Sequence, residues 1–378
     1  MDRKYTEDEF DENKLQDTDR AEMPVKKRKW PIVLAVAAGI LCLCLLAAYQ
    51  VFHHYAGLMK RPSQGTAAGI QETIEPLTEE TVAGTDTDEE DIRALEEQLR
   101  ANLENDAEEL KFDKNVHHIL LIGTDTREND SSGRSDSIIL MSINRKTRQI
   151  VLTSLMRDIY VSIPGAGNNR INTAHAYGGP DLLLKTVNEN FKLKVDDYIR
   201  VNFYAFMDVI DEIGGVLIDV DADEQQIMNN YIQDINDTMG ILDNEELLSP
   251  SDVGLLRLNG KQALAYSRVR YVKGSDFRRT ERQREVLMQV FEETKKLNLL
   301  EMHNVLETLL PEIATNLDEG ELLNLLLGAP DYLGYELISF RIPVNGGYEN
   351  ITIDGKSMLG IDIEKNRNAL IETIYGDK

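Results

Sequence analysis

The chain has 378 residues, of which 42% are hydrophobic and 28% are charged, and its formal net charge is −25. This length allows a membrane anchor and one large domain, and the hydrophobic content excludes a wholly disordered chain. The excess of acidic residues argues against a nucleic-acid-binding protein, because phosphate backbones need a basic surface.

The N-terminal residues predict a membrane anchor. Residues 1–29 are polar and mixed in charge, typical of a disordered tail, and residues 30–52 contain no charged side chain. About 20 apolar residues cross the hydrocarbon core of a bilayer as a helix. Four basic residues, Lys26–Lys29, precede the run and the next base is Lys60, so the N-terminus is expected in the cytoplasm. A cleaved signal peptide is less favoured, because the run is long and no A-x-A-like site follows it.

Residues 53–113 account for a large part of the acidity, with 16 acidic and 5 basic residues. Their N-terminal part is typical of an extended, self-repelling linker. Between 90 and 111, leucines such as Leu95 and Leu99 recur on one helical stripe. The pattern predicts a stalk or docking helix, with a spacer as the default interpretation.

The remaining residues, 114–378, are expected to form one α/β domain outside the membrane. Short β-rich runs alternate with helical patterns, and the polar turn at 144–148 predicts a hairpin. The predicted strands are 116–122, 137–143, 149–155, 198–201, 216–220 and 336–342. The predicted helices are 180–191, 204–213, 279–297, 302–315, 319–327 and 364–375. Residues 222–254 are interpreted as an irregular surface insertion. This order predicts a mixed central sheet flanked by helices on both faces.

Two aspartates lie at the ends of neighbouring predicted strands. Asp125 follows the first strand in GTDTR, and Asp136 precedes the second in GRSD. A carboxylate pair suits Mg²⁺, with water and phosphate completing its coordination. The alternative is a pair of loop aspartates that cap turns, and the two residues alone favour that alternative.

Arginines strengthen the case for an anion site. Eight of them lie in loops, at strand ends or at helix starts: Arg134, Arg157, Arg170, Arg268, Arg270, Arg278, Arg279 and Arg282. If Arg268 and Arg270 lie in a strand, both guanidinium groups project to one side and favour a phosphate between them. The alternative is salt bridging to the abundant acids. Arg279 and Gln283 would share one face at the N-terminal end of a helix, which also favours anions.

Several motifs together resemble one protein family. They are GTDTR…GRSDSIIL, SLMRDIYVSIPG, RINTAHAYGGP, IDEIGGV, LNGKQALAYSRVR and DFRRTERQR, in order across residues 116–290. This set resembles the LytR–CpsA–Psr family of Gram-positive cell-envelope enzymes. The resemblance implies a phosphotransferase that takes a glycopolymer, such as teichoic acid or capsular polysaccharide, from an undecaprenyl-pyrophosphate carrier and joins it to peptidoglycan.

The resemblance also assigns roles to residues by motif position. Asp125 and Asp136 would hold Mg²⁺ on the pyrophosphate, and the polyprenyl chain would occupy an apolar tunnel among the helices. Four arginines would clamp the pyrophosphate as the catalytic set: Arg157, Arg268, Arg270 and Arg279. Four further residues would bind substrate: Arg134, Arg170, Asp276 and Gln283. The sequence departs from the family pattern at Met156, where proline is usual, and at His175, where tyrosine is common.

Two alternative functions stay open from the sequence. One is a non-catalytic envelope regulator that binds polyprenyl phosphates, and the other is a hydrolase of the lipid pyrophosphate. Asp158 and Asp276 are the two carboxylates considered for activating the acceptor hydroxyl group. The apolar residues predicted on the helix at 204–213 are expected in the core, with a lipid groove as the less favoured alternative.

Overall fold

The computed structural model describes residues 50–60, 86–104, 109–124, 135–241, 246–270 and 275–376. The predicted tail, and the predicted span at 30–52 except for its last three residues, lie outside these ranges. No helix within the ranges is both long and apolar enough to cross a bilayer. The residues from Phe52 onward form one compact unit.

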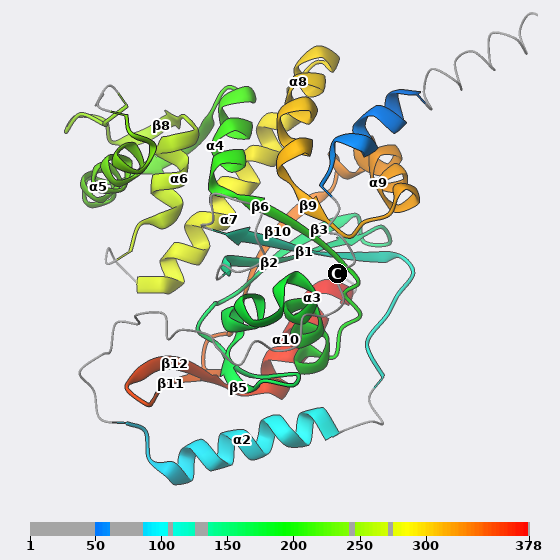
Figure 1. Ribbon diagram of the computed structural model, residues 1–378, viewed down its shortest axis with the longest axis vertical. Coiled ribbons are helices and arrows are strands. Elements are labelled where there is room, and N and C mark those ends of the chain that lie inside the picture. Colours follow the sequence, from blue (N-terminus) through cyan, green and yellow to red (C-terminus); the bar gives the residue numbers. More distant parts are fainter. Residues whose placement is uncertain are drawn as a thin grey trace, which may run out of the picture. The chain divides into compact units, whose positions relative to one another are not determined.

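A six-stranded mixed sheet forms the centre of this unit (Figure 1). Its strands are β1 (Val116–Thr124), β2 (Ser135–Asn144), β3 (Gln149–Leu155), β6 (Asp197–Asn202), β9 (Ala314–Thr315) and β10 (Glu336–Ile342). The spatial order is β10-β3-β2-β1-β6-β9. The predicted hairpin is confirmed, since β2 pairs antiparallel with β3, while β10 and β6 add parallel neighbours.

One face of the sheet is covered by α3 (Ile171–Phe191) and α10 (Ile363–Tyr375) (Figure 1). Helix α3 is kinked at Gly178 and Gly179, and Gly179 has a φ of 65° that side-chain-bearing residues rarely adopt. Pro180 therefore begins the second limb, where it loses no intrahelical hydrogen bond, as the sequence predicts. The largest apolar core lies between these helices and the sheet.

The opposite face carries most of the remaining helices (Figure 1). They are α4 (Phe203–Glu212), α6 (Gly260–Arg268), α7 (Ser275–Thr294), α8 (Leu299–Leu309) and α9 (Glu319–Tyr332). Helices α4 and α6 approach closely at Gly260, where a Cβ atom would lie 2.1 Å from the carbonyl oxygen of Met207. Only glycine fits there. Helices on both faces of a mixed sheet confirm the predicted fold class.

Three small hairpins surround the sheet. They pair β4 (Tyr160–Ile163) with β5 (Gly167–Arg170), β7 (Val216–Val220) with β8 (Gly254–Leu258), and β11 (Tyr348–Ile353) with β12 (Lys356–Ile361). The sequence predicts β7 of these strands and misses the others. Other helices of the described residues are α2 (Glu89–Glu104), α5 (Ala222–Met239), the short 3-10 helix at Leu310–Glu312 and a helical segment at residues 50–58.

The prediction of irregular structure from residue 222 is wrong for α5. Asp221 accepts from the backbone of Glu224, and the Glu224 carboxylate accepts from the backbone of Asp221, so a capping box starts the helix. Met228 and Ile232 are fully buried against α6 and the β7–β8 hairpin. The segment is therefore part of a packed core.

Helix α2 docks on the domain. Leu95 and Leu99, which lie on the predicted apolar stripe, are buried against the β4 and β11–β12 strands. The hydroxyl of Tyr160 donates to Glu96 at 2.9 Å, and Arg367 donates to Asn102 at 2.9 Å. These contacts select the docking alternative over a free spacer for α2.

Candidate functional site

A cluster of arginines and aspartates lies where β3 ends. Arg157 follows this strand, and Asp136 is the second residue of the antiparallel neighbour β2, so the hairpin brings the two together. Arg157 donates to Asp136 Oδ1 at 2.9 Å and to Asp158 Oδ2 at 3.4 Å. The sequence treats Asp136 and Arg157 as separate ligands, and the structure shows them as a direct ion pair.

The β4–β5 hairpin brings a second arginine to the cluster. Arg170 is the last residue of β5, and its Nη1 donates to Asp158 Oδ1 at 3.4 Å. Asp158 therefore bridges Arg157 and Arg170. The bridge depends on chain reversal after β4, which Pro164, Gly165 and Gly167 mark in the sequence, but the resulting pairing of Arg170 with Asp158 has no local signal.

The first turn of α7 adds the remaining members. Asp276 Oδ1 lies 3.6 Å from Arg270 Nε and 3.5 Å from Arg279 Nη1. The carboxyl groups of Asp276 and Asp158 are close enough to interact electrostatically, and Arg157 interacts with both. This proximity joins the two halves of the site. The arginine cluster, as named below, consists of seven residues: Asp136, Arg157, Asp158, Arg170, Arg270, Asp276 and Arg279.

The pKa values of the two neighbouring carboxyl groups shift in opposite directions. Burial and the neighbouring Asp276 raise the pKa of Asp158. Burial also acts on Asp276, but the guanidinium groups of Arg279, Arg157 and Arg270 outweigh it and lower the pKa of that carboxyl. The two neighbouring carboxyl groups are therefore shifted in opposite directions, and Asp276 is the one that the arginines stabilise as an anion.

Arg279 is the most deeply buried arginine of the cluster. Its side chain is 4% exposed, and its Nε atom has no hydrogen-bond partner within the described residues. Burial, together with Arg157, lowers its pKa to about 10. An unsatisfied buried donor is costly, and an anion would satisfy it. With four guanidinium groups against three carboxyl groups, the cluster as described is locally positive.

The predicted pairing of Arg268 with Arg270 is wrong. Arg268 is the last residue of α6, not a strand residue, so the two side chains do not form a same-face pair. Arg268 lies 3.5 Å from Asp234 and stacks over Phe203 and Tyr231 at 5.6 and 5.0 Å from the ring centres. Arg270 joins the arginine cluster, and Arg268 lies against α4 and α5.

Three other predicted site residues do not belong to the arginine cluster as described. Gln283 lies one helical turn after Arg279 on α7, and its side chain lines a cavity rather than joining the cluster. Asp125 and Arg134 lie outside the described residues. Within the described ranges no group of three or more His, Cys, Asp or Glu side chains is placed to hold a metal ion. Asp136 is the described member of the predicted metal pair.

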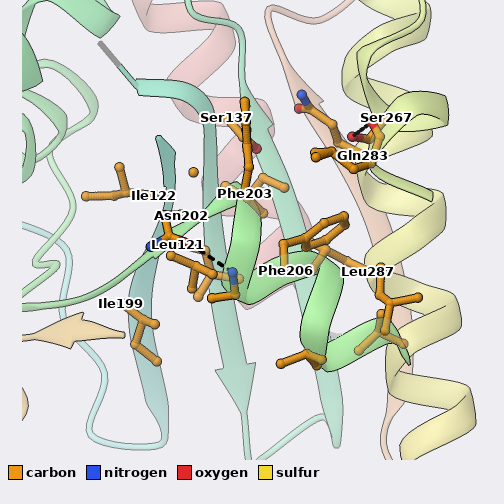
Figure 2. Close-up of a pocket in the computed structure, with 18 of the residues that line it drawn as sticks. Leu121, Ile122, Ser137, Ile199, Asn202, Phe203, Phe206, Ser267, Gln283 and Leu287 are labelled. Atoms are coloured by element: carbon orange, nitrogen blue, oxygen red, sulfur yellow. Dashed lines mark hydrogen bonds between the residues drawn. The ribbon is translucent and has the colours of Figure 1, made fainter. Parts of the chain in front are cut away.

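The cavity that Gln283 lines is about 270 Å³ in volume and lies between the sheet and helices α4, α6 and α7. Its polar lining residues include Ser137, Asn202, Ser267 and Gln283. Figure 2 shows Ser267 and Gln283 at one end, with Phe206 and Leu287 further along an apolar wall. Because Gln283 is one turn from Arg279 on the same face of α7, the polar end of the cavity adjoins the arginine cluster along this helix.

The sequence misses most of this cavity. Asn202 caps α4 by accepting from the backbone of Ala205 at 2.8 Å, which aims Phe203 and Phe206 into the space. The lipid-groove alternative for the helix predicted at 204–213 contains part of the signal. Helix α7 contributes Gln283 and Leu287 to the cavity wall. The only sequence signal for this is their four-residue spacing, which a helix packed in an ordinary core would also show.

The chain is similar in sequence to one known protein family. The family model described as the LytR_cpsA_psr family matches residues 81–373. The polyisoprenyl-teichoic acid–peptidoglycan teichoic acid transferase TagU of Oceanobacillus iheyensis is 30% identical over 313 residues, covering 80% of this chain and 81% of that protein.

Two solved structures share the fold. The structure described as TagT bound to LI-WTA is 29% identical, with a TM-score of 0.54, and the match covers 70% of this chain and 93% of that one. The structure described as the LytR-CPS2A-psr family protein YwtF (TagT) with bound octaprenyl pyrophosphate lipid is 28% identical, with a TM-score of 0.51 and the same coverage.

Proposed function

This chain belongs to the LytR–CpsA–Psr family of glycopolymer transferases, and we propose that it moves a teichoic acid, capsular polysaccharide or similar polymer from an undecaprenyl-pyrophosphate carrier to peptidoglycan. We further propose that it acts outside the cell membrane of a Gram-positive-type envelope, held there by the span predicted at 30–52. Two relatives support this assignment: one is named as a teichoic acid transferase, and the other is a TagT structure with a bound octaprenyl pyrophosphate lipid.

One observation carries the proposal: a positive cluster adjoins the polar end of an apolar cavity. A polyprenyl pyrophosphate is a small, highly charged head on a long apolar tail. The guanidinium groups of the arginine cluster match pyrophosphate oxygens as bidentate donors. The apolar wall, which includes Phe206 and Leu287, suits the isoprenoid chain. Few other ligand classes need both surfaces side by side.

The proposed reaction is a displacement at phosphorus. The acceptor hydroxyl oxygen of peptidoglycan bonds to the phosphorus that carries the glycopolymer. The bond from that phosphorus to the bridging oxygen breaks, undecaprenyl phosphate leaves, and the hydroxyl proton passes to the leaving phosphate or to solvent. Such transfers need mainly positioning and neutralisation of charge. Arg157, Arg270 and Arg279 would supply both by holding the pyrophosphate oxygens.

We also propose that Mg²⁺ takes part. Asp136 accepts from Arg157 through Oδ1, and a carboxylate has a second oxygen that can bind a cation. Mg²⁺ is commonly held by one or two carboxylates together with substrate phosphates, so the residues present fit this ion. Asp136, with Asp125 by family position, would hold it, and the ion would neutralise charge on the pyrophosphate.

A reconstitution assay tests the proposal. The full chain is incubated with a labelled glycan on polyprenyl pyrophosphate and with peptidoglycan, and covalently labelled peptidoglycan is measured. Arg157→Ala should reduce the product at least a hundredfold, while Arg93→Ala, at an exposed site on α2, should not change it. Glycan release without an acceptor would indicate the hydrolase, and binding without any turnover would indicate the regulator.

A further inference from the structure

Two leucines stand exposed at the start of α8. Leu299 is 92% exposed and Leu300 is 68% exposed. Asn298 caps the helix by accepting from the backbone of both Leu300 and Glu301, and the Glu301 carboxylate completes the capping box. The cap fixes this turn, so the two apolar side chains, called the α8 tip below, are held outward in water.

The chain segment that precedes Lys60 shows which way the α8 tip points. Tyr55 contacts His303 at 2.5 Å, and the backbone of Lys60 donates to Ile313 at 3.3 Å. His54 also contacts Glu307 at 2.8 Å, so residues 54 and 55 lie against the middle and end of α8 while Lys60 lies beyond its end. Phe52 precedes these contacts, on the side of the segment that faces away from residue 313. Phe52 is also the last residue of the uncharged run at 30–52.

The α8 tip thus lies at the end of the domain from which the chain continues into its predicted span. Charge around it is balanced rather than repulsive. Lys295 lies 2.6 Å from Glu292, and Lys296 lies 2.8 Å from Glu293. The apolar side chains, rather than net charge, therefore decide what this surface contacts.

The other end of α8 reaches the substrate cavity. Leu309, the last residue of the helix, lines that cavity. Ten residues of helix separate Leu309 from Leu299, a distance of about 15 Å. Helix α8 therefore joins the end of the domain nearest the predicted span to the apolar part of the site.

We propose that the α8 tip inserts into the outer leaflet of the bilayer and sets the orientation of the cavity toward the membrane. This inference rests on the membrane location in the proposed function. Its occupant is a lipid surface, because the uncharged run enters at this end and a polyprenyl carrier must leave a bilayer to reach Leu309. Paired exposed leucines held rigidly at such a place are typical of an interaction surface.

Depth-dependent quenching tests the insertion without turnover. The full chain with Cys42→Ser and Cys44→Ser is reconstituted in phosphatidylglycerol–phosphatidylcholine vesicles, and Leu300→Cys carries an environment-sensitive fluorophore. Lipids brominated on the acyl chain should quench this label at least twofold. The matched control is Glu349→Cys on exposed β11, across the sheet from α8 in Figure 1, and it should not be quenched.

Two results would overturn the inference. Equal quenching at positions 300 and 349, or none at either, would remove the lipid contact. Crosslinking of Leu300→Cys to a second copy in sparsely loaded vesicles would assign the tip to a protein interface instead. Neither readout depends on transferase activity, so failure of the proposed function would leave the quenching result intact.

A substitution pair links the α8 tip to activity. Leu299→Asp with Leu300→Asp should lower transfer from a bilayer-embedded carrier about tenfold, the factor expected when buried leucine area is lost. Transfer from a short, water-soluble carrier analogue should be unchanged, because the variant leaves the cavity and the arginine cluster intact. An equal loss with both carriers would contradict docking and indicate a folding defect.

Discussion

The buried ion pair between Arg282 and Glu224 ties α5 to α7 and supports a quantitative prediction. The two side chains are 1% and 4% exposed. Arg282 donates to Glu224 Oε1 from Nε at 2.9 Å and from Nη2 at 2.7 Å, and its Nη1 donates to the carbonyl oxygen of Val269 at 3.1 Å. The guanidinium also stacks over Tyr266, 5.7 Å from the ring centre.

Glu224→Ala should destabilise the domain by about 3–5 kcal/mol, because it leaves a buried guanidinium without its counter-charge. The same change removes one half of the α5 capping box. Removing both charges together, as Glu224→Leu with Arg282→Met, should cost less than the single change, since no uncompensated charge remains buried. The double variant therefore separates the cost of an orphaned charge from the value of the pair.

Urea unfolding of the full chain in detergent, followed by circular dichroism, measures these free energies. Glu89→Ala removes the partner of Arg93 in an exposed pair, with side chains 86% and 77% exposed, and should not move the midpoint. A loss below 1 kcal/mol in Glu224→Ala, or a double variant less stable than the single one, would refute the reasoning. Transferase activity should fall with Glu224→Ala as well, because Arg282 holds the carbonyl between Arg268 and Arg270.

Four further outcomes are expected. Arg279→Met should weaken binding of polyprenyl pyrophosphate at least tenfold by calorimetry, because a buried fork of donors is lost. Leu287→Trp should weaken binding of octaprenyl pyrophosphate but not of inorganic pyrophosphate, because the indole fills the apolar cavity. Asp136→Asn should raise the Mg²⁺ concentration needed for half-maximal transfer, and chelation should abolish wild-type transfer. Burial lowers the pKa of His118 from 6.5 to about 4, so the unfolded state binds more protons between these values and stability falls as the pH drops through that window. His118→Gln should remove roughly 3 kcal/mol of that fall, measured by urea unfolding at pH 7 and pH 4.

Strands and helices with strong local patterns could be predicted from the sequence. The β2–β3 hairpin and the second limb of α3 follow from an alternating or apolar run bounded by a turn signal. The parallel pairing of β10 with β3 joins Glu336 to Gln149, and no local pattern encodes such a distant partner. This strand pairing is decided by tertiary contacts alone.

The error at α5 has a different cause. Its exposed face is rich in Asp, Asn and Gln, which suggested a loop. The buried residues Met228, Ile232 and Ile235 nevertheless recur at helical spacing, and Asp221 with Glu224 forms a capping-box pattern. The sequence therefore contained a helix signal, but the polar composition of the segment favoured the prediction of a loop.

The sequence predicted which types of residue form the site, but not which of those residues pair with one another. Arg268, Val269 and Arg270 alternate as a strand would, yet the capping box of Asn259 and Gln262 starts a helix that ends at Arg268. A three-residue alternation is too short to distinguish a strand from the end of a helix.

The arginine cluster is held together by its own aspartates, and this arrangement shapes how it can bind an anion. Asp276 neutralises Arg270 and Arg279 when no ligand is bound, so a pyrophosphate must compete with that carboxylate or share its donors. Four guanidinium groups face three carboxyl groups, so the cluster keeps a positive formal charge. A chain with a net charge of −25 thus presents a locally positive site, and its aspartates position the guanidinium groups before a substrate arrives.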